Sequence, residues 1–402
     1  MRNSLSFEKP KALLLVLALV ALTLLLGLGS KSEAKTLKIG SIYSLTGPGS
    51  EVNILMEKGV VLCKDWINAK GGITVKGEKY LIDIVSEDDK GSAEGAVTAA
   101  TKLVQADKLK FVLGQTTPFL VESIASVTEP NKVVYFASDH DTLSKDYPYT
   151  ISAYFAYSTP KPILYDYLVK TYPKVKKVAI TEIDEPSVAR AANVARKELK
   201  KRGLEDVGGQ KYPFGPQDYY PILNKVLTLK PDAIDMNMEF PQGAATLVKQ
   251  ARELGFTGPI LGNSPWDPAF VRDAIGKKEY ASDFIFPTFE PKSAAASLPP
   301  ITSEIVKLWT DTYKIPFDIG ALRGWDPLWT MLQAIEAAQS FEPGDVIKAF
   351  EKMKNIKTGV GTAKIGGLAT FGINHMVCTP CPLTRIENGN VQFIGWFTPN
   401  IP

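Results

Sequence analysis

The strongest constraint on the fold is an alternation, from residue 37 to about residue 290, of short β-branched runs with longer segments of helical period. Such alternation is typical of βαβ units, in which neighbouring strands pair in parallel. The runs that read as strands are Leu37–Tyr43, Leu81–Ser86, Phe111–Gly114, Val133–Ala137, Val178–Ile183, Ala233–Met238 and Pro259–Gly262. The helical segments are 52–67, 92–105, 119–128, 161–171, 188–202, 242–254 and 325–339.

Two breaks in composition divide this series. Residues 150–162 combine aromatic residues with two prolines, and a second break lies near residues 284–291. If the chain passes from one lobe to the other at each break, the first lobe regains a segment after the second is complete. Since the chain is also long enough for two cores, the sequence predicts an α/β fold of two doubly wound lobes, each with a central parallel sheet.

The N-terminal segment has the order of a signal peptide. Three basic residues precede an apolar run at 12–28, and small residues at Ser32 and Ala34 fit a cleavage site. We therefore expect residues 1–34 to be removed after Ala34, leaving a soluble periplasmic or otherwise extracytoplasmic protein. An uncleaved membrane anchor is the alternative, because the apolar run is near the lower limit for a membrane span.

Charge and motifs argue against several function classes. Loss of residues 1–34 removes four basic and two acidic residues, so the net charge falls from +3 to +1, which gives no reason to expect a nucleic-acid partner. A dinucleotide fingerprint starting at Gly47 fails because Val52 occupies its third glycine position, which favours a simple turn before a helix. With no nucleotide loop, no nucleophile elbow and two histidines, we expect no enzymatic activity and no cofactor.

The cysteines allow two interpretations. Cys378 and Cys381 are close in sequence, and in an exported protein such a pair is a candidate disulfide. His375 would make a third metal ligand, but a structural zinc site uses four, so we expect no metal. Cys63 lies on the apolar face of its helix, where a buried thiol behaves as a small hydrophobic group.

Several motifs together resemble one family. They are Leu37–Gly40 leading into Ser44-Leu-Thr-Gly-Pro48, then Ile67-Asn-Ala-Lys-Gly-Gly-Ile73, Glu87-Asp-Asp89, Phe111–Gly114 and Gln250-Ala-Arg-Glu-Leu-Gly255. The chain resembles the periplasmic solute-binding receptors of ABC transporters, specifically the type I group that contains the leucine/isoleucine/valine-binding proteins. The resemblance implies two lobes joined by a three-segment hinge, with crossings near 157, 285 and 360–373, that close on a solute and dock on membrane permease subunits.

The resemblance also implies domain boundaries. The first lobe would comprise residues 36–157 plus 286–360, and the second lobe residues 158–285 plus 361–402. The solute would bind between them.

The first lobe would supply five ligand-binding residues. Thr116 and Thr117 precede a helix, so their hydroxyls and amides would bind a ligand carboxylate, although the alternative is that they cap that helix. Ser138, Asp139 and His140 replace a family stretch of small residues and threonine. Their polar groups favour a cationic or hydroxylated part of the ligand or, equally, contacts within the loop.

The second lobe would supply four more. Ser187 stands where the family usually has an aromatic residue, Phe240 would pack on the solute, and Glu239 would pair with an ammonium group. Ser264 stands where leucine-type receptors carry a glutamate for the α-ammonium, so for an amino-acid ligand Glu239 or Asp139 would have to supply the counter-charge.

Two tryptophans, Trp266 and Trp325, are candidate walls of the site or parts of the core. Together these residues predict a receptor that delivers an amino acid or a related small carboxylate to an ABC permease. The alternative is a sensory or regulatory protein that binds amides or amino acids without transport.

Overall fold

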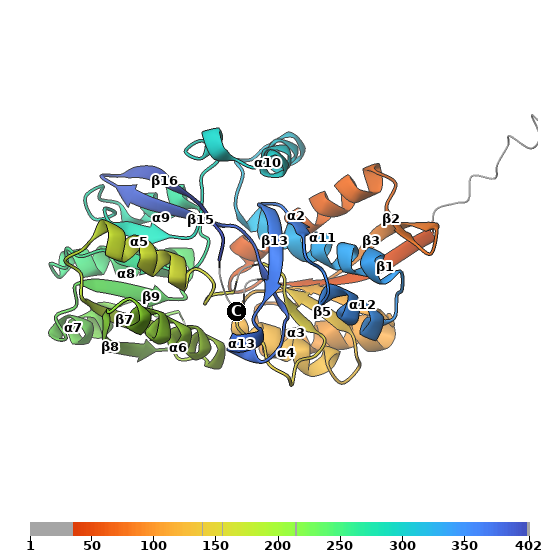
Figure 1. Ribbon diagram of the computed structural model, residues 1–402, viewed down its shortest axis with the longest axis horizontal. Helices are drawn as coiled ribbons and strands as arrows, with labels where there is room; N and C mark the ends of the chain where they lie inside the picture. Colours follow the sequence, from red (N-terminus) through yellow and green to blue (C-terminus); the bar gives the residue numbers. More distant parts are fainter. Residues whose placement is uncertain (1–34, 139, 155, 214, 400–402) are drawn as a thin grey trace, which may run out of the picture. The chain divides into compact units, whose positions relative to one another are not determined.

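The computed structural model describes residues 35–399 apart from 139, 155 and 214. The predicted signal segment and Asp139 therefore lie outside the described residues. From Thr36 onward the chain forms one compact unit that contains two sheets (Figure 1). Within residues 35–399, no helix has the length and apolar character needed to cross a membrane.

The first sheet has nine strands in the order β12-β13-β14-β6-β5-β4-β1-β3-β2. Its centre is parallel, because β1 pairs with β4, β4 with β5, and β5 with β6 in the same direction. Antiparallel hairpins, β2–β3 and β12–β13, lie at its two edges. The bounds are β1 Lys35–Tyr43, β2 Ile73–Val75, β3 Glu78–Asp88, β4 Phe111–Gly114, β5 Val134–Ala137, β6 Thr150–Ser152, β12 Ile356–Thr358, β13 Gly361–Gly366 and β14 Met376–Cys378.

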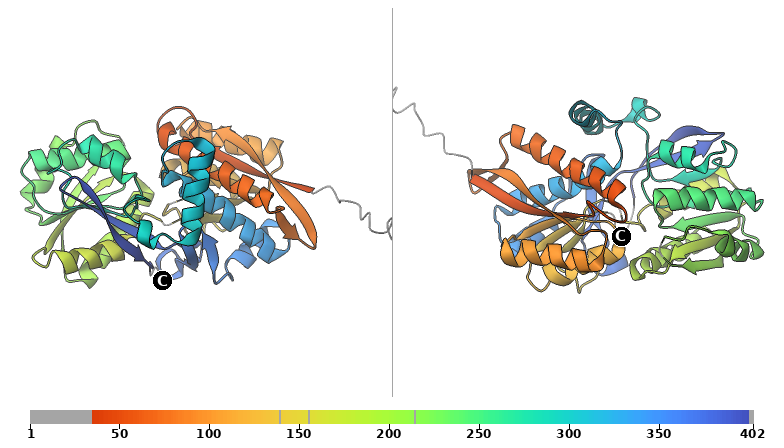
Figure 2. Two further views of the ribbon diagram at one scale, coloured as in Figure 1. Left: turned by 90° about the horizontal axis from the view of Figure 1, so that it is seen from above. Right: turned by 180° about the vertical axis from the view of Figure 1, so that it is seen from behind.

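Helices cover both faces of this sheet (Figure 2). One face packs against α2 (Ser50–Ala69), α11 (Gly320–Ala338) and α12 (Pro343–Phe350), and α10 (Pro300–Tyr313) contacts α2 through hydrogen bonds of Glu304 and Tyr313. The other packs against α3 (Ala93–Thr101), the π-helix η1 (Lys102–Ala106) and α4 (Pro118–Thr128). A short 3₁₀ turn, η2 (Ala295–Ser297), precedes α10, and α13 (Leu368–Phe371) lies between β13 and β14.

The second sheet has seven strands in the order β16-β15-β11-β10-β9-β7-β8. The five strands from β11 to β8 are parallel, and the hairpin β15–β16 joins in the antiparallel direction. Helices α5 and α6 cover one face, while α7, α8 and α9 cover the other. The bounds are α5 Lys161–Thr171, β7 Lys177–Ile183, α6 Pro186–Lys201, β8 Glu205–Tyr212, α7 Tyr220–Thr228, β9 Ala233–Asn237, α8 Pro241–Glu253, β10 Ile260–Gly262, α9 Pro268–Ile275, β11 Phe284–Phe286, β15 Cys381–Glu387 and β16 Asn390–Phe397.

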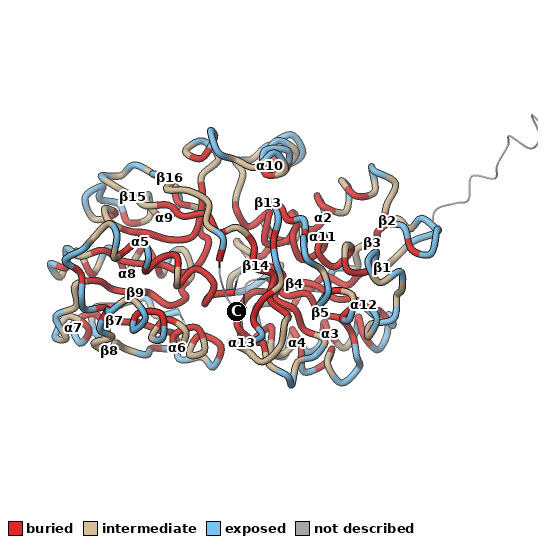
Figure 3. The backbone as a smooth tube through the Cα atoms, viewed as in Figure 1, coloured by how far each residue is buried: buried red, intermediate tan, exposed pale blue. Residues whose placement is uncertain are grey.

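The predicted α/β fold with two parallel-centred sheets is confirmed, and buried segments run along both sheets (Figure 3). The chain changes sheet between Ser152 and Lys161, after Phe286, and between Cys378 and Cys381. The third change lies later than the predicted crossing at 360–373. β13 and β14 pair with the first sheet, although residues 361–402 were assigned to the second lobe, because the β12–β13–β14 hairpins extend that sheet from β6. The lobe boundaries otherwise stay a prediction.

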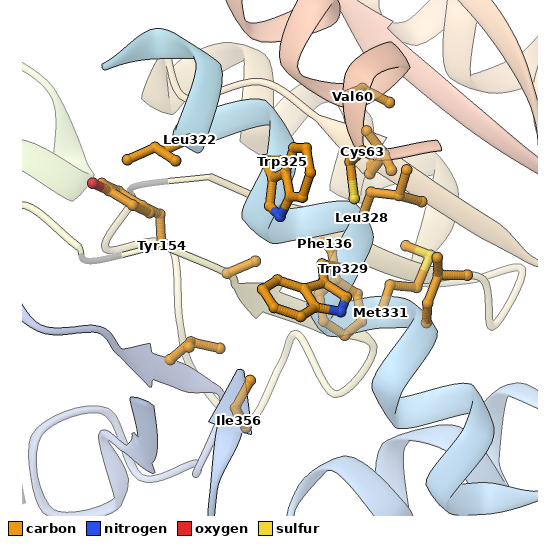
Figure 4. Packing of buried hydrophobic residues seen from close by; sticks show 14 of the residues in the cluster. Val60, Cys63, Phe136, Tyr154, Leu322, Trp325, Leu328, Trp329, Met331 and Ile356 are labelled. Atoms are coloured by element: carbon orange, nitrogen blue, oxygen red, sulfur yellow. The ribbon is translucent and has the colours of Figure 1, made fainter. Parts of the chain in front are cut away.

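Close packing between α2 and α11 fixes the helix that carries a central residue of the site. A β-carbon added to Gly59 would lie 2.1 Å from the carbonyl oxygen of Ala321, and one added to Gly324 would lie 1.8 Å from that of Met56. Only glycine permits this approach. In the core that α11 covers, Trp325 lies beside Trp329, with the two ring centroids 6.3 Å apart (Figure 4). Of its two predicted roles, Trp325 therefore has the core one.

Candidate functional site

A cavity of about 260 Å³ lies between residues of both sheets. From the first sheet's side it is lined by the start of α2, the loop after β4, and the start of α11; from the second, by the loops after β9 and β10. Three of these loops directly follow parallel strands, which end at Gly114, Asn237 and Gly262. Ligands of doubly wound folds bind at the carboxyl ends of parallel strands, and the volume suits a small solute.

Thr116 and Thr117 line this cavity, but their amides are already engaged. Both amides donate to Oε1 of Gln115, at 3.1 and 3.4 Å. The Gln115 amide nitrogen donates in turn to Ser44 at 3.0 Å and to Asp89. The backbone amides that were predicted to bind a ligand carboxylate are therefore already hydrogen-bonded within the protein. Thr117 is the N-cap residue of α4, in agreement with the capping alternative, but its side chain makes no capping hydrogen bond.

Among the described residues that line the cavity, the cationic group is Arg323, in the first turn of α11, which was not among the predicted site residues. Its Nη2 donates to the Thr116 hydroxyl at 2.8 Å, and its side chain is 6% exposed. A cation near a helix N-terminus opposes the helix dipole, and its burial is costly. The signal in the sequence was a single basic residue within the apolar run Ala321–Trp325.

Ser138 positions this arginine. Its hydroxyl donates to the Arg323 carbonyl at 2.6 Å, and its own carbonyl accepts from the Ser152 hydroxyl at 3.1 Å. Ser138 does not line the cavity. The predicted ligand residue therefore acts in the structure as a support of α11.

Asp318 is the acidic neighbour of Arg323 in the cavity lining. Burial raises its pKa to about 6, the Asp267 charge adds to the rise, and the Gly320 amide at 2.6 Å and the Arg323 charge oppose it. The side chain keeps part of its surface open to the cavity. Its charge therefore changes close to neutral pH.

Glu239 lines the opposite side and is nearly fully buried. Its Oε1 accepts the Phe240 amide at 3.0 Å, and its Oε2 accepts the Tyr212 hydroxyl at 3.2 Å. Burial raises the pKa of Glu239, and these hydrogen bonds oppose part of that rise. Both carboxylate oxygens therefore have protein partners.

Apolar side chains form the rest of the wall. Met238 lies in the left-handed region at φ 68°, where its amide donates to Asn263 at 2.8 Å. Trp266 donates from its ring nitrogen to the Glu239 carbonyl at 3.1 Å and packs against Phe286 at 5.5 Å. A β-carbon on Gly49 would lie 3.8 Å from the Phe240 ring, so residues from the two sides approach each other closely at the rim. Trp266 and Phe240 thus both line the cavity, and Trp266, for which a wall role and a core role were both predicted, also belongs to the buried core of the second sheet.

Two other predicted residues do not line the cavity. His140 is buried, with the Thr142 amide donating to its Nδ1 at 3.1 Å, so Nε2 carries the proton toward the Ile151 carbonyl at 3.4 Å. Burial lowers the pKa of His140 to about 3. Ser187 is buried near the start of α6. The alternative of contacts within the loop thus describes His140, and Ser264 does line the cavity.

The cysteines give neither a disulfide nor a metal site in the described residues. Cys63, Cys378 and Cys381 are free and buried, and no group of three metal-ligating side chains occurs in the part of the chain that the structure describes. The disulfide prediction is not borne out because Cys378 ends β14 in the first sheet while Cys381 begins β15 in the second.

Comparison with known proteins assigns the architecture to a family. The model of the family described as "Periplasmic binding protein" matches residues 36–390. The chain belongs to this family. The Leu/Ile/Val-binding protein homolog 8 of Brucella melitensis is 24% identical over 354 residues, covering 84% of this chain and 85% of that protein.

Solved structures agree in fold. A branched-chain amino acid transporter substrate-binding protein from Streptococcus pneumoniae, in complex with isoleucine, superposes with a TM-score of 0.73 at 23% identity, covering 91% of this chain and 100% of the other. A solute-binding protein of an ABC transporter from R. palustris, in complex with benzoate, gives 0.71 at 18% identity, covering 90% and 97%. Both share the fold of this periplasmic binding protein, which is a solute-binding fold.

Proposed function

We propose that the protein is the extracytoplasmic receptor of an ABC importer and that it captures a small carboxylate in the cavity between the two sheets. Arg323 carries the proposal. Its guanidinium is buried and bonded to the hydroxyl of Thr116 in a cavity that both sheets line. A guanidinium binds carboxylates through charge-assisted hydrogen bonds, and arginine is the residue best suited to bind a carboxylate at a buried site.

The proposed capture combines three groups of this cavity. Arg323 would bind the ligand carboxylate, the Thr117 hydroxyl would add a hydrogen bond, and apolar side chains such as Phe240 and Trp266 would pack on the rest of the solute. Since these residues follow strands of different sheets, a solute that contacts both would favour the closed arrangement. Membrane permease subunits would then receive the solute from the closed receptor, as in the family to which the chain belongs.

The direct test is a ligand screen by thermal unfolding of the purified protein, with amino acids, aliphatic and aromatic carboxylates, amides and polyamines. A ligand at 100 times its Kd stabilises the folded state by about 2.7 kcal/mol, which raises Tm by a few degrees. We expect carboxylates to do so and polyamines not to. If no carboxylate shifts Tm while another class does, the proposed carboxylate capture is wrong.

A variant pair tests the site itself. Arg323→Gln removes a charged hydrogen-bond donor of about 1.5–3 kcal/mol, so carboxylate affinity should fall by about 10–100-fold. Arg202→Gln is the matched control, because Arg202 lies at the C-terminal end of α6 and bonds Asp166 and Glu198 away from the cavity. Equal affinities of the two variants, measured by titration calorimetry, would refute the role of Arg323.

A further inference from the structure

The charges of the cavity wall point to a narrower ligand class. This inference rests on the proposed function, since it concerns the solute of the same cavity. Among the described residues, four carboxylates line that cavity: Glu51, Glu239, Asp267 and Asp318. A bound ammonium group needs at least one of them as an ionised and accessible partner.

Glu239 and Asp267 already serve the protein. Both oxygens of Glu239 accept hydrogen bonds, and its burial favours the neutral acid. Asp267 caps α9 by accepting the Ala269 amide at 2.9 Å. Neither carboxylate is arranged to surround an ammonium group, which has three donors to satisfy.

Glu51 and Asp318 are no better placed. Glu51 is exposed at the start of α2, where water competes for its charge. Asp318 accepts the Gly320 amide at 2.6 Å and is the acidic neighbour of Arg323, which the solute carboxylate would also approach. An ammonium group bound at Asp318 would thus compete with the Arg323 guanidinium for the negative charge of the Asp318 carboxylate.

The unfilled hydrogen-bonding positions of the wall are neutral. Among the described residues that line the cavity, the buried side-chain polar atoms without a partner are Oδ1 of Asn53 and Oγ of Ser264. Asn53 is fixed by its own donation to the Gly49 carbonyl at 2.9 Å. An amide oxygen and a hydroxyl suit a hydroxyl group on the solute or a water molecule, and neither offers a counter-charge.

From these observations we infer that the cavity takes an apolar monocarboxylate whose only charge is the carboxylate, and that it discriminates against the corresponding amino acid. The carboxylate lies against Arg323. The apolar body lies among Met238, Phe240 and Trp266. An ammonium group on the solute would lose its water, and the described carboxylates of the wall already accept protein hydrogen bonds or, in the case of Glu51, are exposed to water. A hydroxyl on that body is accepted at Ser264.

Matched ligands that differ in one charged group test the inference. The pairs are 4-methylpentanoate with leucine, and 3-phenylpropanoate with phenylalanine, with 3-methylbutylamine as the ligand that keeps the ammonium group and lacks the carboxylate. Each is titrated into the purified protein by calorimetry at pH 7.5. We expect the acid of at least one pair to bind at least tenfold more tightly than its amino acid, and the amine not to bind.

The outcomes separate the inference from the proposed function. If an amino acid binds as tightly as its acid or more tightly, the inference is overturned while carboxylate capture stands. If the amine binds best, both the inference and the carboxylate assignment fail. Absence of binding by every acid and amino acid also overturns both.

Discussion

The charge of Asp318 gives the affinity for a carboxylate a pH dependence whose sign depends on the ligand. Asp318 lines the cavity beside Arg323, and its pKa is raised to about 6 by burial. A carboxylate ligand meets repulsion from ionised Asp318, so binding favours the protonated form and takes up a proton. Affinity therefore falls as the pH rises through 6. A ligand anchored by an ammonium group would show the opposite sign.

The magnitude follows from the protonated fraction of Asp318. With a pKa of about 6, that fraction is about one half at pH 6 and about one hundredth at pH 8, which sets an upper limit of about 50-fold, or about 2.3 kcal/mol, on the loss of affinity. Because Asp318 is partly open to the cavity and Arg323 offsets its charge, we expect a loss of about tenfold.

Calorimetric titration of 3-phenylpropanoate at pH 6, 7 and 8 measures this effect. Asp318→Asn should bind equally at all three values and more tightly than the unaltered protein at pH 8, since an asparagine oxygen still accepts the Gly320 amide. Glu51→Gln, at an exposed carboxylate of the same cavity, is the control and should keep the slope. A pH-independent affinity in the unaltered protein, or a slope that survives in Asp318→Asn, would contradict the reasoning.

Three further predictions concern stability, each measured by urea unfolding. Burial raises the pKa of Asp326 to about 8, so the folded protein keeps this proton at a pH where the unfolded chain has lost it. The free energy of unfolding should therefore fall by up to about 1.4 kcal/mol per pH unit as the pH rises from 4 to 8. Asp326→Asn should remove this slope, and parallel pH profiles of the variant and the unaltered protein would refute the prediction. Lys161→Met removes the cation that pairs with buried Asp235 at 2.6 Å and leaves, within the described part of the chain, only the Tyr165 hydroxyl as a side-chain donor to it. The change should cost about 3–5 kcal/mol, most of it regained with Asp235→Asn, and a cost below about 1 kcal/mol would contradict this. Arg190→Ala breaks a partly exposed pair with Glu122 at 3.0 Å and the hydrogen bonds that Arg190 donates to the Asp141 carbonyl and the Thr142 hydroxyl. It should cost about 1–3 kcal/mol, so a cost near zero would contradict this role of Arg190.

Local sequence patterns predicted the central part of the fold well. The strand Phe111–Gly114 and the helix Lys161–Thr171 agree with the structure at both ends, because apolar period and flanking Gly or Pro residues are local signals. Strands β12 and β14 were missed because each is only three residues long, and β14 pairs with β6, which is distant in sequence. Helix α11 begins at Gly320 rather than Trp325. Two glycines and Pro327 lower its helical propensity, while tight packing against α2 stabilises it.

Local sequence signals also located part of the candidate site. Thr116, Thr117, Glu239, Phe240 and Ser264 line the cavity because they directly follow predicted strands or precede predicted helices. Arg323 comes from the misplaced start of α11, and its meeting with Thr116 is a tertiary contact across 207 residues. The roles of Gln115 and Ser138 as supports depend on hydrogen bonds that no local pattern encodes.

The most direct test of the central claim is a crystal structure of the protein with a bound apolar carboxylate such as 3-phenylpropanoate. The account predicts the carboxylate at hydrogen-bonding distance, about 3 Å, from the Arg323 guanidinium, with the phenyl ring among residues that follow β9 and β10. A ligand bound outside this cavity, or one whose carboxylate points away from Arg323, would contradict it.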